Sequence, residues 1–185
     1  MRSVGTRERV IEVADRLVQE KGYNRTTLAD LAQKARVHLG SIHYFFKAKR
    51  VLGEAVIEKR LEDYGRLLAQ WDEVADPRRR LLAFVEMTVG ARHDLSKKGC
   101  PIGSLCQELH KEGGPLAARS AKLFRLFLEW IEQQFRQLGK DKEARILALH
   151  VMAALQGASL LALTFKDPRL VVKEAEVLRR WLKAL

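Results

Sequence analysis

The chain has 185 residues, of which 47% are hydrophobic and 31% are charged. This balance excludes an intrinsically disordered chain, and the length suffices to bury a core in one large domain or two small ones. The formal net charge is +11, and residues 1–50 carry eleven Lys and Arg against five Asp and Glu. This net of +6 in about a quarter of the chain predicts a surface that binds a polyanion.

The lack of a secretory signal and the small number of cysteines predict a cytoplasmic protein. The first ten residues contain no apolar segment of the kind that a secretory signal needs. Two cysteines, Cys100 and Cys106, are too few for a disulfide framework and fit a reducing compartment. Residues 146–165 carry no formal charge, but polar side chains interrupt them, so we interpret this segment as a buried helix and predict no membrane span.

The fold class is predicted to be all-α. The chain contains only four prolines, and no segment alternates apolar and polar residues over a strand length. We expect about nine helices: a three-helix helix-turn-helix domain in residues 1–50, followed by a larger helical bundle in residues 51–185.

The first helix is predicted to begin at Thr6 and to end at Gly22, where a left-handed residue is favoured. Residues 26–49 then read as two short helices joined by a tight turn. Thr27 can cap the first of these, and Asp30 completes a capping box. In the second, residues 39–46, Ile42 and Phe46 fall on one side, which leaves a small, polar and aromatic face for a DNA major groove.

The remaining helices follow from apolar spacing and from Gly, Pro and Asp signals. They are expected over residues 49–71, 77–94, a short stretch through 105–109, 115–138, 141–165 with Asp141 as its cap, and 168–185. The helix over 141–165 is apolar on nearly every face, and such a helix must be covered on all sides. We therefore expect a homodimer that forms through the last two helices.

The segment TRERVIEVADRLVQEKGYNRTTLADLAQKARVHLGSIHYFFKAKRVLGEAV resembles the N-terminal domain of tetracycline-repressor-type (TetR family) regulators. The matching features are Gly22-Tyr23, Thr26-Thr27, Leu31-Ala32, Val37, Gly40, Ile42, Tyr44, Phe45-Phe46 and Lys49. Two positions depart from the family pattern, since His38 and Ala48 stand where Ser, Thr or Asn usually caps a helix.

The resemblance implies roles for individual residues and for the whole molecule. Residues expected to contact phosphates are Thr27, Tyr44, Lys47 and Lys49, and those expected to face bases or the groove are Arg36, His38, Leu39, Gly40, Ser41 and His43. The function that it implies is that of a repressor, which binds a palindromic double-stranded DNA operator as a dimer and is released by an unidentified small-molecule effector.

Effector-binding residues are harder to assign, because aromatic and sulfur-containing side chains also build ordinary cores. If the bundle encloses a ligand, as the resemblance implies, Met87, Phe127, Met152 and Gln156 are our choices for its wall. Cys100 is a possible redox or electrophile sensor, because it follows Lys97-Lys98 and precedes a predicted helix, and both features stabilise a thiolate. Its alternative role is that of a packed residue at a turn.

The chain lacks a phosphate-binding loop, a dinucleotide fingerprint, a zinc-protease motif and a nucleophile elbow, so we predict no enzyme, no cofactor and no metal site. Two alternatives to a ligand-released repressor remain open. One is a DNA-binding regulator switched by modification of a cysteine, and the other is an architectural DNA binder without a ligand. A ligand-storage bundle or an enzyme with an incidental basic segment is a weaker alternative.

Overall fold

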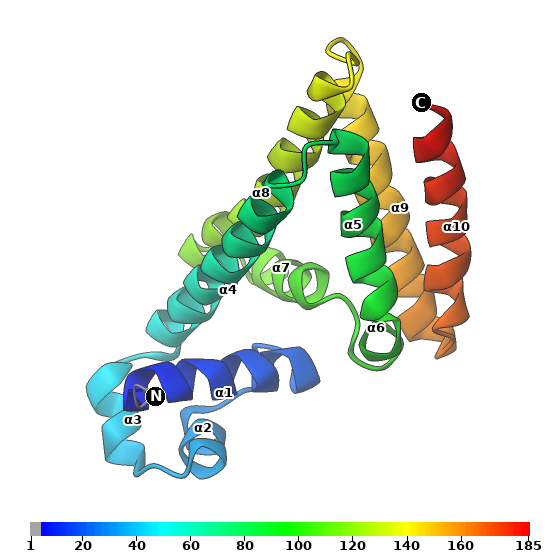
Figure 1. Cartoon of the computed structure of the whole chain (residues 1–185). Helices are drawn as coiled ribbons and strands as arrows, with labels where there is room; N and C mark the ends of the chain where they lie inside the picture. The colour runs from blue at the N-terminus through cyan, green and yellow to red at the C-terminus, as the bar shows by residue number, and fades with distance from the viewer. Residues whose placement is uncertain (1–4) are drawn as a thin grey trace. The chain divides into compact units, whose positions relative to one another are not determined.

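The computed structural model describes residues 5–185, and these residues form ten α-helices and no strand (Figure 1). The helices are α1 (Thr6–Lys21), α2 (Leu28–Ala35), α3 (Leu39–Phe45), α4 (Lys49–Asp72), α5 (Pro77–Gly90), α6 (Arg92–Lys98), α7 (Pro101–Glu112), α8 (Pro115–Gln137), α9 (Ala144–Phe165) and α10 (Arg169–Ala184). The all-α prediction is confirmed, with a helix-turn-helix at the N-terminal end and helices alone in the rest of the described chain.

The helices form two compact units. The first unit comprises the described part of residues 1–63 together with Ser104–Leu123, and the second comprises Tyr64–Gly103 and Phe124–Leu185. Helices α4, α7 and α8 therefore each contribute residues to both units. The functional division at residues 50 and 51 stays a prediction.

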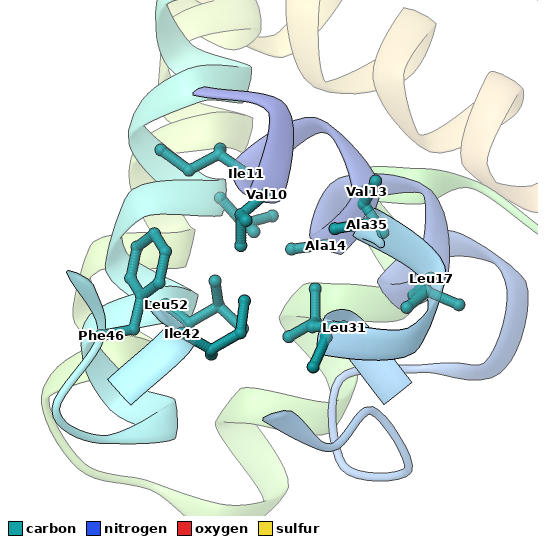
Figure 2. Packing of buried hydrophobic residues seen from close by; sticks show 12 residues of the cluster. Val10, Ile11, Val13, Ala14, Leu17, Leu31, Ala35, Ile42, Phe46 and Leu52 are labelled. Carbon is teal, nitrogen blue, oxygen red and sulfur yellow. The ribbon is translucent and has the colours of Figure 1, made fainter. Parts of the chain in front are cut away.

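A single apolar cluster holds the first three helices and the start of α4 together. Figure 2 shows side chains from α1, α2, α3 and α4 pointing toward one another. Ile42 and Phe46 lie in this cluster without any exposed surface, packed with α1 residues such as Val10. Burial of this apolar area therefore fixes the orientation of α3 about its own axis.

Local signals set the ends of these helices as predicted. Gly22 ends α1 at a φ of 88°, which lies in the left-handed region that favours glycine. Thr27 and Asp30 form the expected capping box at the start of α2. Arg36 ends α2 at a φ of 52°, so a residue with a Cβ occupies a left-handed position at some cost in backbone energy.

The first turns of α4 and α8 also pack in the first unit. A Cβ atom added to Gly53 would lie 2.9 Å from the Tyr23 ring and 2.9 Å from a Leu116 methyl group, so the glycine allows this close approach. The Tyr23 hydroxyl donates to the Lys49 carbonyl at 3.1 Å. Burial, with a smaller contribution from nearby glutamates, raises the pKa of Tyr23.

In the second unit, α5, α9 and α10 lie side by side, and α6 packs on α9 (Figure 1). An ion pair with two hydrogen bonds, 2.5 and 2.9 Å long, connects Arg179 of α10 to Glu86 of α5. These hydrogen bonds hold the pKa of Glu86 below its usual value.

Two expected helix boundaries are wrong. The helix predicted over 77–94 breaks at Ala91, because α5 ends at Gly90 and α6 begins at Arg92, which raises the number of described helices to ten. Asp141 does not cap α9, which begins at Ala144 without a side-chain cap. A turn over residues 141–143, in which the Glu143 N–H bonds the Lys140 carbonyl, precedes this helix.

Helix α9 is long and apolar enough to cross a membrane, a property that it shares with core helices of soluble proteins. One side of α9 packs on its neighbours, whereas the other side exposes apolar groups such as Ile146, at 66%, and Phe165, at 67%. The helix is therefore covered on one side only within a single chain.

A buried guanidinium stabilises the end of the second unit near α5. Arg80 donates to the carbonyls of Val74 and Asp72 at 2.5 and 3.1 Å, and to the side-chain oxygens of Gln134 and Gln137 at 3.0 Å each. Arg80 is only 9% exposed, and of its acceptors Gln134 is fully buried, so the Gln134 side-chain oxygen depends on Arg80 rather than on water.

We predict that Arg80→Ala lowers the free energy of unfolding by about 3 kcal/mol, because four hydrogen bonds of a buried guanidinium are lost and the buried Gln134 oxygen loses its donor. Its neighbour Arg79 is exposed, so Arg79→Ala serves as the control and should change stability by less than about 0.5 kcal/mol. Urea unfolding followed by circular dichroism measures both. Equal midpoints for the two variants would show that the Arg80 hydrogen bonds contribute nothing.

Candidate DNA-binding surface and effector cavity

The outer face of α3 is exposed over most of its length. Leu39 and Tyr44 are 43% and 79% exposed, and Gly40 and His43 are exposed as well. No heavy atom lies within 4 Å of the position that a Cβ on Gly40 would occupy. The face opposite Ile42 thus carries small, polar and aromatic side chains and is exposed, as a helix that enters a DNA major groove requires.

The start of α3 shows how the unusual His38 is accommodated. His38 is the N-cap residue with an extended backbone, but its side chain accepts no capping hydrogen bond. The His38 carbonyl instead accepts from the Ser41 N–H at 2.9 Å, and Ser41 is half-buried. The exposed imidazole of His38 is therefore directed outside the helix cap.

Thr27 is more constrained than the other residues expected to contact phosphates. Its hydroxyl donates to Asp30 at 2.7 Å and accepts from the Asp30 N–H at 3.1 Å. Lys21 also binds the Asp30 carboxylate at 2.6 Å. Hydrogen bonds from Lys21 and Thr27 hold the pKa of Asp30 well below its usual range. Thr27 thus contacts a phosphate only by giving up its hydrogen bond to Asp30.

Lys49 is held in place by the turn between α1 and α2. Its ammonium donates to the Asn24 carbonyl at 2.7 Å and lies 4.8 Å from the centre of the Tyr23 ring. An ammonium has three donors, so two remain for a phosphate. Lys47 is exposed and has no hydrogen bond or ion pair within residues 5–185.

The same turn contacts helix α7, a connection that the sequence analysis missed. The Asn24 N–H donates to Glu108 at 3.0 Å. A Cβ on Gly22 would lie 2.2 Å from the same carboxylate, so only glycine leaves room for it. Glu108 is 84 residues away from Asn24 in the chain, and no local pattern indicates that they meet. Helix α7 thereby contacts the segment that positions Lys49.

The second unit contains a cavity of about 250 Å³ without a charged side chain in its wall. All four residues chosen from the sequence, Met87, Phe127, Met152 and Gln156, line it. The remaining lining residues are Tyr64, Phe84, Thr88, Ala91, Leu95, Cys100, Pro101, Ile102, Phe124, Leu155 and Ser159. A wall of this kind suits an uncharged, largely apolar small molecule.

Cys100 lies at the start of α7 and lines the cavity. Its sulfur accepts from the Gly103 N–H at 3.4 Å and from the Gln156 amide at 3.3 Å. Cys106 is buried in the first unit, where its thiol donates to the Ser120 carbonyl at 3.3 Å. The two cysteines therefore differ in surroundings, and only Cys100 borders the cavity.

Metal chemistry finds no support in the described residues. Across residues 5–185, His, Cys, Asp and Glu side chains nowhere gather in a group of three that could hold an ion.

The exposed second helix of a helix-turn-helix defines the class of protein, a DNA-binding transcription regulator. Sequence models of two families match the chain: "Bacterial regulatory proteins, tetR family" over residues 10–56, and "Transcriptional regulator LmrA/YxaF-like, C-terminal domain" over residues 77–175. The chain belongs to the TetR family of bacterial transcription regulators. Members of this family are generally DNA-binding proteins without catalytic activity.

Similar proteins extend over nearly the whole chain. The uncharacterized HTH-type transcriptional regulator YxaF of Bacillus subtilis is 27% identical over 91% of this chain and 92% of its own. The HTH-type transcriptional repressor DhaR of Mycobacterium sp. is 26% identical over 83% of this chain and 80% of its own. The crystal structure of a TetR regulator from Legionella pneumophila has the same fold, with a TM-score of 0.87 and 23% identity over 97% and 98% of the two chains.

We predict that Lys47→Ala weakens binding to every DNA sequence and lowers the slope of log K against log salt by about 0.9 per subunit, or about 1.8 for a dimer, because each subunit loses one phosphate contact. Lys49→Ala should do the same and also reduce stability, since its bond to Asn24 disappears. Fluorescence anisotropy at several salt concentrations, with thermal unfolding in parallel, separates the two effects. Unchanged DNA affinity in both variants would remove these residues from the phosphate-binding surface.

Proposed function

We propose that the protein is a cytoplasmic repressor, which binds a palindromic operator as a homodimer and leaves it when a small molecule occupies the cavity. The observation that carries this proposal is an uncharged cavity whose wall includes the first turn of α7. The same helix carries Glu108, which binds the turn that positions Lys49. The relative DhaR is named a transcriptional repressor, which supports repression rather than activation by this protein.

The proposed switch requires a difference in affinity between two states. A ligand that contacts Ile102 in the cavity wall favours one position of the N-terminal end of α7. If α7 moves as a rigid helix, Glu108 moves with it and shifts the Asn24 turn. The two copies of α3 in the dimer then no longer match the spacing of successive major grooves. Operator affinity falls at most by the ratio of the ligand's affinities for the two states.

The exposed apolar side of α9 supports a homodimer. Its exposed apolar and small residues lie on one face, most of them three or four positions apart: Ile146, Leu149, Ala153, Gly157, Leu160, Leu161 and Phe165. A Cβ on Gly157 would have no heavy atom within 4 Å, so the middle of this stripe is open for close approach of another helix. The same stripe on a second copy would bury it.

We predict that Gly157→Glu converts the dimer into a monomer, because it places an unpaired charge in the middle of a buried apolar interface. Gly65→Glu is the matched control, since Gly65 also lies in a helix with open space around its Cβ position. Sedimentation velocity distinguishes the two species. A Gly157→Glu protein that stays dimeric would place the interface on another surface.

The effector cavity can be tested by filling it. We predict that Thr88→Leu, which adds apolar volume inside the cavity, weakens binding of the uncharged fluorophore N-phenyl-1-naphthylamine by about tenfold or more. Operator affinity without a ligand should stay within about twofold of the wild type, because Thr88 belongs to the second unit. Fluorescence titration and DNA anisotropy measure the two quantities.

Compounds that displace the fluorophore are expected to lower operator affinity in the wild type and to have no effect on Thr88→Leu. If they displace the fluorophore yet leave operator affinity unchanged, the cavity is no switch, and an architectural DNA binder without an effector becomes the better assignment.

A second candidate mechanism is covalent modification of Cys100. The observation that favours it is the position of the sulfur in the cavity wall, where it accepts from Gln156 and Gly103. An alkyl group or an added oxygen on this sulfur would disrupt both hydrogen bonds and add bulk at the start of α7. Release of DNA by iodoacetamide that is lost in Cys100→Ser and kept in Cys106→Ser would favour this mechanism over a non-covalent effector.

A further inference from the structure

A groove in the first unit, between α1 and the end of α2, is lined by four cationic side chains. Arg9 and Arg16 come from α1, and Lys34 and Arg36 from the end of α2 and the residue after it. The larger part of the groove measures about 580 Å³. Figure 2 shows Val13 of α1 beside Ala35 of α2, and both belong to the groove's lining.

The four cations of this groove have no partner of opposite charge in the described chain. All four are exposed, and none of their side chains makes a hydrogen bond or an ion pair within residues 5–185. Several other cations of the same unit do form ion pairs: Lys21 with Asp30, Arg50 with Glu54, and Arg60 with Asp15. Of the groove's lining residues, only Glu20 is acidic. Four converging positive charges repel one another, so an anion bound here would relieve this repulsion.

The dimensions and chemistry of the groove favour a strand of phosphates over a small anion. Arg9 and Arg16 lie seven residues apart on one helix, a distance of about 10 Å. This distance spans about three phosphates of one DNA strand, counted along the duplex axis. The lining contains no aromatic side chain on which the base of a free nucleotide could stack.

Arg36 lies both in the groove and close to the exposed face of α3. It stands in the turn between α2 and α3, three residues before α3 begins. We propose that this groove binds the phosphate backbone of operator DNA, at phosphates beyond those reached by Tyr44, Lys47 and Lys49. The inference rests on the proposed function and adds Arg9, Arg16 and Lys34 to the DNA-binding residues.

The test uses Arg16→Gln, Lys34→Gln and the double variant in the full-length protein. Glutamine preserves helix propensity and most of the side-chain length while removing the charge. Arg125→Gln is the matched control, because Arg125 is an exposed arginine of α8 in the second unit. Anisotropy at several salt concentrations, on an operator duplex and on a random duplex, gives the salt dependence of each protein.

In a dimer both subunits lose the contact, so each single variant is expected to lower the slope of log K against log salt by about 1.8, and the double variant by about 3.6. The loss of affinity should be the same for both duplexes, since phosphate contacts carry no sequence information. Ethylation interference on the operator should show phosphates next to each half-site that matter to the wild type and no longer matter to the double variant. Arg125→Gln should match the wild type throughout.

Equal slopes and equal interference patterns in the double variant and the Arg125→Gln control would overturn the inference while leaving the proposed function intact. Inorganic tripolyphosphate that binds the wild type but not the double variant, with DNA slopes unchanged, would also overturn it and make the groove a small-anion site. A wild type that binds no duplex at all would overturn the proposed function itself, and this inference with it.

Discussion

Complete burial of Ile42 and Phe46 is the constraint on which the DNA-binding surface depends. These residues lie four positions apart, so both point to the same side of the chain around α3 and pack in one cluster with α1, α2 and the start of α4. Because Ile42 and Phe46 fix the buried side of α3, Gly40, His43 and Tyr44 face the solvent. A polar substitution at Ile42 would therefore weaken DNA binding although Ile42 does not contact DNA, because α3 would no longer be held in its orientation by the apolar cluster.

The two units differ in the side chains that they offer to a partner. The first unit concentrates uncompensated positive charge around a helix-turn-helix, which attracts DNA over long range and weakens with salt. The second unit contains a cavity without charged residues in its wall, so shape and apolar area would decide which ligand binds there. Helix α7 has residues in both units. In the proposed switch, this continuous helix connects the cavity of the second unit to the first unit.

Much of the first unit could be predicted from the sequence, because its signals are local. The capping box of Thr27 and Asp30, the end of α1 at Gly22 and the apolar spacing in α3 each involve residues a few positions apart. The four effector residues were found from side-chain type combined with the family resemblance, and the structure brings them to one cavity. Ligand binding by these residues stays a prediction.

What the sequence analysis missed depends on contacts between distant segments. The hydrogen bond from Asn24 to Glu108 joins the turn after α1 to helix α7, and no local sequence pattern indicates this contact. Helix α9 was expected to be apolar on nearly every face, but periodicity does not show which face its own chain covers and which face stays open. No proline marks the break at Ala91, which lies between the apolar residues Val89 and Leu95, so the sequence signals favoured one longer helix there.

Selection of DNA ligands from a random duplex library tests whether this protein recognises a specific DNA sequence as a dimer, as we propose. We expect enrichment of an inverted repeat, with half-sites separated by about one helical turn or a multiple of it. Enrichment of a single half-site without symmetry would contradict the dimer. Retention of duplexes without any enriched sequence would contradict sequence-specific recognition by α3 and leave only the electrostatic attraction of the basic unit.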